Sequence, residues 1–350
     1  MISTHNSYEE FTQEIIRIDN AKKDYIIGAE DFWMQDGRVA VRVAQSDIEP
    51  LDVKSFAHSQ IAEKMGIPKT YYDKMAMEMP RLRDLNVNAW WKKQTEDGSR
   101  YMARTLDGSL RALLSDSYKP IDNHAVLASF IDAVKASGVP SPTIRSQSLT
   151  ETNMYLQVVF YDLKKDVAPG EPVALGLSLR NSEVGKSAVG IELFLEVLKC
   201  SNGMVGRNVM RQIHLGRRID NGAGVIFSME AIEADVYATK LAMRDAMKSI
   251  IRADTITTEV NRILAAREKK IKPTKFDEFI DSIKDKIILK ESEKDIVMEL
   301  LNREGDFSVW GLSSAITDGL KLLDSRDRQY ELERAGYDLL GITVPEKFAA

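Results

Sequence analysis

The segment "SAVGIELFLEVLKC" (residues 187–200) decides how the middle of this chain folds. Apolar side chains stand at every second position from 189 to 197 and alternate with a mixed set that includes Glu192 and Glu196. A period of two places the apolar set on one face of a strand. The pattern predicts a strand of an antiparallel sheet, with one face packed and the other open to solvent. Because "IELFLEVLK" also holds good helix formers, a helix remains the alternative.

Further strand candidates lie on the N-terminal side of this segment. Two are long, "NMYLQVVFYDL" (153–163) and "EPVALGLSLRNS" (171–182), and three short ones are "YIIG", "FWMQ" and "VAVRV" between residues 25 and 43. Asp-Gly pairs in "QDGR" (35–38) and at Asp107-Gly108 predict tight hairpins. Helices are expected between the strands, at 8–19, 54–65, 69–78, 80–92 and 123–137. Asp122 or Asn123 is expected to cap the last of these helices.

The C-terminal third has a different pattern. No glycine occurs between Gly224 and Gly305, and only Pro273 and Pro345 follow residue 172. Apolar residues recur there at helical spacing, which predicts helices at 229–250, 256–267, 275–288, 293–303, 308–323 and 327–340. The predicted fold class is therefore α+β, an antiparallel β-sheet core with helices followed by an all-helical C-terminal region. We expect two domains, a nucleic-acid-binding core at 1–224 and a helical oligomerisation or partner-binding domain at 225–350.

Composition limits the class of protein. The 350 residues carry a formal net charge of -5 and a single cysteine, Cys200, which excludes an internal disulfide and a Cys-rich zinc site. No apolar run approaches the roughly 20 residues that span a bilayer, and the N-terminus lacks the order of a signal peptide. We expect a cytoplasmic protein with no membrane partner.

Signals for catalysis are weak. The four histidines are scattered without the paired spacing of metal ligands, and Arg180 stands where a phosphate-binding loop ending in Gly185-Lys186-Ser187 would need glycine. No catalytic residue, metal or cofactor is predicted. One enzymatic alternative is a metal-dependent nuclease using Asp162 and Lys164 at the end of an apolar strand, with Glu151 as the second carboxylate. The same acid-x-Lys spacing recurs elsewhere in the chain, so the pattern is not specific.

Nucleic-acid binding has more distributed signals. "NAWWKKQ" (88–94) places Trp90 and Trp91 directly before Lys92 and Lys93, and the hairpin that follows adds Arg104 and Arg111. Single strands bind to basic grooves that also present aromatic faces for base stacking. The alternative interpretation is that one tryptophan fills the core and the lysines solvate the end of a helix.

A second signal is an acid-free strip, "KCSNGMVGRNVMRQIHLGRR" (199–218). Its glycines permit close approach of the backbone, and arginine can bind two phosphate oxygens at once. A plain exposed hairpin is the alternative. The candidate phosphate contacts of this strip are Lys199, Arg207, Arg211, Arg217 and Arg218.

Several blocks resemble a widespread family of phage and plasmid proteins catalogued as a domain of unknown function. They are "LRALLSDSYKPIDNHAVL" (110–127), "LRNSEVGKSAVGIELFLEVLKCSNGMV" (179–205), "WGLSSAITDGL" (310–320) and "YELERAGYDLLG" (330–341). The residues that match the family pattern are Ser115, Asp116, Tyr118, Asn123, Asn181, Ser182, Gly185, Cys200, Asn202 and Gly203. This resemblance implies a mobile-element origin and a bacterial host cytoplasm, and it carries no catalytic residues.

The order of helix, hairpin, antiparallel sheet and long helix is also similar to that of the phage single-strand annealing proteins of the Rad-type superfamily. That resemblance implies single-stranded DNA as a partner, a homo-oligomer and no nucleotide cofactor. The leading hypothesis is a non-enzymatic single-stranded DNA-binding and annealing protein of a phage or prophage. The alternative is a protein-interaction factor, such as a host-defence inhibitor or an assembly protein that binds a host or phage protein through its acidic helical tail. The nuclease is the third hypothesis.

Overall fold

The structure is a computed structural model, and it describes residues 7–42, 48–96, 98–116, 118, 120–138, 141–198, 202–212, 229–284, 287–319 and 322–350. Helices make up 49% of the chain and strands 27%, with the antiparallel sheets in the N-terminal and central parts. This confirms the α+β prediction.

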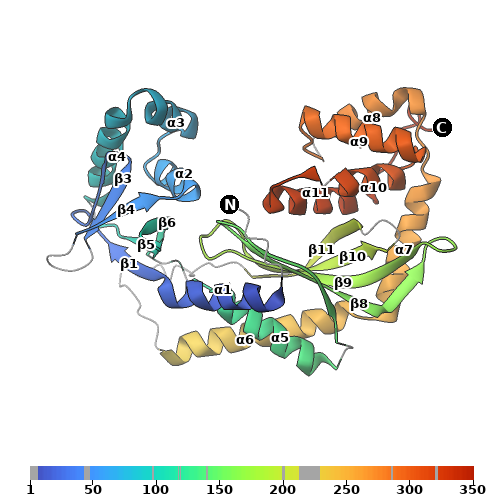
Figure 1. The fold of residues 1–350 in the computed structure, drawn as a ribbon, viewed down its shortest axis with the longest axis horizontal. Coiled ribbons are helices and arrows are strands. Elements are labelled where there is room, and N and C mark those ends of the chain that lie inside the picture. Colours follow the sequence, from blue (N-terminus) through green and yellow to red (C-terminus); the bar gives the residue numbers. More distant parts are fainter. Residues whose placement is uncertain are drawn as a thin grey trace.

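The N-terminal lobe is a six-stranded sheet with three helices packed on it (Figure 1). Its order is β1-β5-β6-β4-β3-β2, in which β4 runs parallel to β6 and the other pairs are antiparallel. The strands are β1 (Lys23–Ile27), β2 (Phe32–Gln35), β3 (Arg38–Arg42), β4 (Ile48–Val53), β5 (Tyr101–Leu106) and β6 (Ser109–Ser115). The helices are α2 (Ser55–Lys64), α3 (Lys69–Glu78) and α4 (Pro80–Thr95). They enclose an apolar cluster of their own, which makes this part a separate lobe.

Both Asp-Gly hairpins are present in this lobe. Asp36 and Gly37 have φ of 51° and 79°, and Asp107 and Gly108 have φ of 49° and 69°. Two consecutive positive φ values are the requirement of a type I′ turn, whose twist matches that of the flanking strands. The sequence prediction of hairpins at these pairs is confirmed by β2–β3 and β5–β6.

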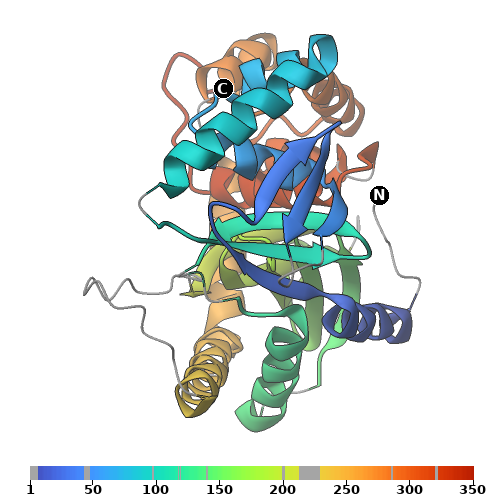
Figure 2. The same cartoon turned by 90° about the vertical axis from the view of Figure 1, so that its left-hand side faces the viewer.

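The central element is a five-stranded antiparallel sheet of order β11-β10-β9-β8-β7. Its strands are β7 (Thr143–Leu149), β8 (Met154–Asp166), β9 (Pro172–Asn181), β10 (Val189–Val197) and β11 (Asn202–Gln212). The segment that the alternation assigns to a strand is β10, so the helix alternative is wrong. One face of the sheet, which includes Leu177 and Leu193, joins an apolar cluster with α1 (Tyr8–Ala21), α5 (Asn123–Ser137) and α6 (Met229–Ile250), helices that lie below the sheet in Figures 1 and 2.

The second face of the sheet is not open to solvent, which corrects the sequence prediction. Helix α11 (Arg326–Leu339) covers it, as Figure 1 shows. The Tyr155 and Tyr330 rings lie 5.2 Å apart across this interface, and the Gln157 side-chain amide donates to the Glu333 carboxylate at 2.8 Å. Glu192 is 0% exposed. The polar side chains of β10 are buried with partners, because Tyr330 of α11 donates to Glu192, and Arg145 and Tyr161 of the sheet donate to Glu196.

The C-terminal helices share the main apolar cluster with the sheet. Besides α6 and α11 they are α7 (Ala253–Glu268), α8 (Phe276–Ser282), α9 (Glu291–Glu304) and α10 (Val309–Gly319), with a short 3₁₀ turn at Pro273–Lys275. One cluster runs from Phe11 through Leu177 and Met247 to Phe348. In the described residues, the C-terminal helices therefore pack into the same apolar cluster as the central sheet, and the two-domain division at 224/225 stays a prediction.

Candidate functional site

Helix α4 presents part of the predicted nucleic-acid set on the surface of the N-terminal lobe. Trp90 is 46% exposed, and Lys92 and Lys93 on the following turn are exposed as well. The helix begins with Pro80 at its first position, where a missing N–H costs nothing. Lys93, three residues after Trp90, lies on the same side of the helix, whereas Lys92 lies nearly opposite. An exposed indole and an exposed ammonium group on one side combine the two chemistries that hold single strands.

The buried side of α4 is fixed to the lobe by polar contacts. The Asn88 amide accepts from the Met34 N–H at 2.7 Å and donates to the Met34 carbonyl at 2.8 Å, which satisfies backbone groups on edge strand β2. The Gly37 N–H donates to Asp84 at 3.3 Å. These bonds fix the position of α4, so its outer side chains are presented on a rigid element.

Trp91 belongs to the core and not to the surface. It is 1% exposed, and its ring stacks on Phe32 with centroids 4.3 Å apart. Its indole N–H points to the carbonyls of Gly28 and Ala29 at 3.2 Å. The structure therefore places only one of the two adjacent tryptophans where a base could stack. Successive helical residues differ in direction by about 100°, so neighbours need not share an environment.

The surface of α3 and α4 is locally basic. Residues 69–96 contain six basic and four acidic side chains, a net charge of +2 in a chain of net charge -5. The acidic groups pair with Lys69, Lys74, Arg83 and Lys93. Arg81 and Lys92 have no ion-pair partner among the described residues, and they lie eleven residues apart, close to three helical turns, on the same flank of α4.

The same surface exposes large apolar side chains. Met77 is 79% exposed, and Tyr71, Met79 and Leu85 are also exposed. Exposed methionines are typical of adaptable binding surfaces. Exposed apolar groups and cations without ion-pair partners among the described residues make this helix pair a candidate interaction surface.

Arg104 is structural, contrary to its place in the predicted nucleic-acid set. Its side chain is 2% exposed and donates to Asp24 and Asp122, each at 2.8 Å, and to the Glu183 carbonyl at 2.7 Å. Burial lowers the pKa of Arg104, but the charges of Asp122 and Asp24 outweigh it and leave the pKa raised. With its guanidinium already bound by these oxygens, Arg104 is not available to a phosphate.

Arg111 is likewise engaged within the protein. It is nearly buried, and its guanidinium donates at 3.1 Å to the Glu183 carboxylate. The other oxygen of Glu183 accepts from the Asn123 N–H at 2.8 Å. Glu183 thus caps α5, and neither Asp122 nor Asn123 makes the side-chain cap that the sequence predicts. Asp122 is instead occupied by Arg104 and Lys22.

Four residues of the family-like pattern meet around the β9–β10 loop (residues 182–188). The Asn181 amide donates to Asn123 Oδ1 at 2.8 Å, and the Ser182 hydroxyl donates to the Thr152 carbonyl at 2.6 Å. Gly185 has φ of 78° and packs beside Leu114. The loop also accepts a bond from Gln60 of α2 at the Val184 carbonyl. These residues join the N-terminal lobe to the central sheet, which gives them a structural role.

The acid-free strip falls largely outside the described residues. Lys199, Arg217 and Arg218 lie there entirely. Arg207 and Arg211 have their backbone in β11, paired with β10, but their side chains are outside the described part. The prediction that these five residues contact phosphates stays a prediction.

The nuclease residues do not come together. Asp162 and Lys164 are exposed near the end of β8, whereas Glu151 precedes the start of that strand. Asp162 lies eight residues further along β8 than Met154, which corresponds to a distance of about 26 Å along the strand. Glu151 accepts a bond from the Phe56 N–H at the start of α2. Among the described residues, no group of three His, Cys, Asp or Glu side chains could hold a metal ion.

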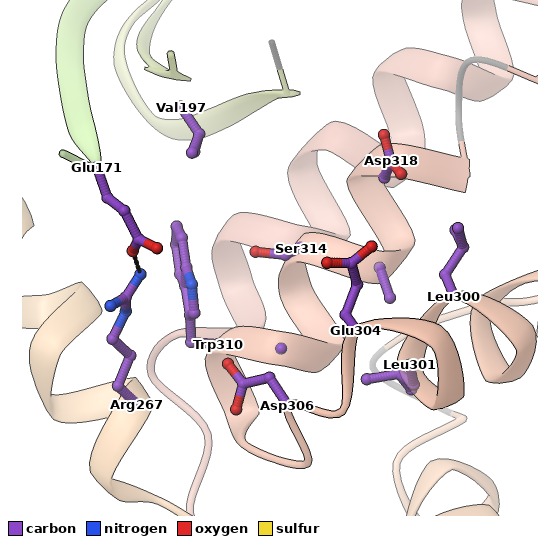
Figure 3. A pocket seen from close by; sticks show the side chains of 12 residues that line it. Glu171, Val197, Arg267, Leu300, Leu301, Glu304, Asp306, Trp310, Ser314 and Asp318 are labelled. Carbon is purple, nitrogen blue, oxygen red and sulfur yellow. Dashed lines mark hydrogen bonds and ion pairs between the residues drawn. The ribbon is translucent and has the colours of Figure 1, made fainter. Parts of the chain in front are cut away.

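A carboxylate-lined cavity lies between the C-terminal helices and the sheet (Figure 3). Its volume is about 290 Å³, and Trp310 forms one wall. Each of its four carboxylates has a basic partner, and these pairs are Glu171–Arg267, Glu304–Arg303, Asp306–Lys270 and Asp318–Arg303. Because the charges are paired within the protein, the cavity does not present free ligands to a cation.

A second cavity lies between the sheet and α11, where the sequence analysis predicted nothing. Its volume is about 390 Å³, and its lining includes Arg180, Lys186 and Arg334. These cations come from β9, the β9–β10 loop and α11, so no local sequence pattern unites them. Strand alternation places Arg180 on the polar face of β9, but it does not show that α11 brings Arg334 beside it.

Comparison of the chain with protein-family models, with curated proteins and with solved structures found no match. Within the described residues, no helix is both long and apolar enough to cross a membrane. The interpretation of the candidate sites therefore depends on their geometry.

Proposed function

We propose that the protein binds single-stranded DNA on the outer surface of α3 and α4 and acts without catalytic chemistry, as an annealing protein of a phage or prophage. One observation carries the proposal: Trp90 is a half-exposed indole on a rigidly anchored helix, and exposed Lys93, three residues later, lies only about 60° from it around the helix axis. A base that stacks on Trp90 would leave its phosphates within reach of nearby lysines.

The proposed mechanism is electrostatic and steric. Lys93 beside Trp90 attracts the phosphate of the stacked nucleotide, Arg81 and Lys92 on the other flank of α4 attract phosphates further along the strand, and the Trp90 ring holds a base away from its neighbours. An unpaired base held in this way can test a complementary strand, so annealing requires positioning and no bond cleavage. A homo-oligomer would place several such helices along one strand, and the acid-free strip would add phosphate contacts.

The test is binding of a fluorescently labelled oligothymidylate, followed by anisotropy at several salt concentrations. We expect Lys92→Ser/Lys93→Ser to weaken binding and to flatten the log-log salt dependence by about 0.7 for each lost contact. The matched control is Lys164→Ser/Lys165→Ser, which removes two adjacent exposed lysines from β8. Equal affinities and slopes for both double variants would refute the α4 interface. An oligonucleotide that stays intact with magnesium or manganese excludes the nuclease hypothesis.

A protein partner is the second candidate function, and the exposure of Met77 and Met79 favours it. The sequence analysis placed such an interface on the acidic helical tail, which exposes Tyr237, Leu264, Ile288 and Leu322, whereas Met77 and Met79 lie at the end of α3. A partner retained from host lysate after nuclease treatment, and lost in Met77→Ser/Met79→Ser, would support this function. A retained set that disappears with nuclease would instead be bridged by DNA.

A further inference from the structure

The polar cavity between the central sheet and α11 is lined by cationic side chains whose hydrogen-bond donors are not all paired within the described part of the protein. About 390 Å³ in volume, it falls within the size range of small-molecule sites. The residues that matter most for its chemistry are Asn153, Arg180, Lys186, Ser187, Tyr330 and Arg334.

Arg180 is held in place, but its hydrogen-bond donors are not all paired. Its guanidinium lies over the Tyr330 ring, 4.8 Å from the centroid, and 3.6 Å from Glu192. Its Nε is buried and has no hydrogen-bond partner, and the structure gives its side chain no hydrogen bond within the described residues. A guanidinium has five N–H donors, and a buried donor without an acceptor costs free energy. An acceptor in the cavity could pair with the guanidinium donors that face it.

Two further cations line the same cavity. Arg334 approaches Glu192 only to 4.0 Å, and Lys186 is exposed, with its ammonium over the Phe56 ring at 5.4 Å. Neither has a closer carboxylate partner in the described part of the chain. Three cations from separate elements therefore retain free donors at one cavity.

The carboxylates nearby offset these charges incompletely. Asp327 already accepts from four neutral side chains, those of Thr150, Thr152, Asn153 and Tyr155. Glu192 accepts from the Tyr330 hydroxyl, and burial raises its pKa despite the nearby Arg180. The fourth basic residue of the lining, Arg328, is bound to Glu293 and Glu331. The cavity lining holds four basic residues and the three acidic residues Asp327, Glu331 and Asp338, so its formal charge is +1.

We propose that this cavity binds a phosphate group through Arg180, Lys186 and Arg334, as part of a free phosphate or nucleotide or of a single strand. A free phosphate or a phosphate monoester fits better than a carboxylate because it has at least three free oxygens and nearly a double charge, whereas a strand phosphodiester offers two free oxygens and one charge. The Ser187 hydroxyl adds a polar contact at the same cavity. The proposal does not depend on strand binding at α4.

The experiment measures the Tm of the full chain with inorganic phosphate, and then with a deoxynucleoside monophosphate, against chloride at equal ionic strength. Lys186→Gln and Arg334→Gln are the test variants because both side chains reach solvent and their loss leaves Arg180 and its packing in place. Arg303→Gln, an exposed arginine outside this cavity, is the matched control. A second arm measures the affinity of all four proteins for an oligothymidylate.

A rise in Tm with phosphate or nucleotide that both test variants lose, and the control keeps, supports a free ligand. If the free anions have no effect but both test variants bind the oligonucleotide about tenfold more weakly than the control, the ligand is a strand phosphate. No difference between the test variants and the control in either arm overturns the proposal. The comparison uses no variant on α4. The phosphate proposal can therefore fail while strand binding on α4 holds, and the reverse is also possible.

Discussion

Glu183 and Asn123 lie 60 residues apart, and the carboxylate of the first caps the helix that begins at the second, at 2.8 Å from its N–H. The same carboxylate binds Arg111 of the N-terminal lobe at 3.1 Å. A single buried side chain therefore joins the β9–β10 loop, α5 and β6. We therefore expect substitutions around residue 183 to destabilise the fold.

Loss of the Glu183 carboxylate is expected to destabilise the fold. Glu183→Ala leaves Arg111 without its charge partner and α5 without its cap, and breaking a nearly buried pair of this kind costs about 3–5 kcal/mol. Urea unfolding measures the change. The matched control is Glu151→Ala, because exposed Glu151 accepts from the Phe56 N–H at the start of α2 and its loss should cost about 1 kcal/mol. Equal losses in the two variants would contradict the assigned role of Glu183.

A methyl group at Gly185 is expected to be more costly than one at Gly170. Both residues have a left-handed φ, of 78° and 77°, which strains any L side chain. A Cβ at Gly185 would also lie 2.8 Å from Leu114 Cδ2, whereas a Cβ at Gly170 has no heavy atom within 4 Å. Gly170→Ala should lose about 1 kcal/mol in urea unfolding, and Gly185→Ala clearly more. A smaller loss at Gly185 would show that the loop does not pack against β6 as described.

Acid is expected to weaken the N-terminal lobe through His58. Burial, followed by the charges of Arg83 and Lys69, lowers the pKa of His58 from 6.5 to about 4. The unfolded chain therefore binds this proton more readily than the folded chain, so acid favours unfolding. The stability contribution is complete above pH 6.5 and is lost as the pH falls from there towards about 4.

His58→Gln removes this titration while keeping a polar partner for the Tyr72 hydroxyl, which lies 2.7 Å from the His58 ring. Free energies of unfolding are compared at about pH 7 and about pH 5, on either side of the ordinary histidine pKa. The wild-type protein should lose more stability between these values than the variant. An identical loss in both would place the source of acid sensitivity elsewhere.

The sequence patterns that predicted the fold correctly are those in which residues close together in the chain determine the local structure. The alternation in β10, the Asp-Gly pairs and the glycine-free helices each depend on residues a few positions apart, and all three appear in the structure. The prediction that one face of β10 is open to solvent was wrong, because the Tyr330 hydroxyl of α11, more than 130 residues later in the chain, donates to Glu192 on that face.

Candidate site residues were harder to predict for the same reason. Adjacent Trp90 and Trp91 have one sequence context but opposite environments, and only the packing of α4 on β2 separates them. Arg104 and Arg111 look like free cations in the sequence, yet Asp122 and Glu183 reach them from later segments. The cavity at Arg180 has no sequence signal because its cations meet only in the fold.

The acid-free strip gives a prediction about salt. If Arg207, Arg211, Arg217 and Arg218 each contact a phosphate, the affinity for a single strand falls with salt at a log-log slope of about -0.7 per contact. Replacing all four with alanine should flatten the slope by up to about 2.8. Circular dichroism confirms that the variant is folded. An unchanged slope would remove the strip from the interface and leave α4 as the candidate.

The most direct test of the central claim compares the affinity of an oligothymidylate for the wild-type protein, Trp90→Phe and Trp90→Ala. Stacking of one base on the exposed ring predicts that alanine weakens binding about 5- to 150-fold and that phenylalanine keeps most of the affinity. Urea unfolding should show little change in either variant, because Trp90 lies outside the core. Three equal affinities would show that no base stacks on Trp90, and the proposed interface on α4 would be contradicted.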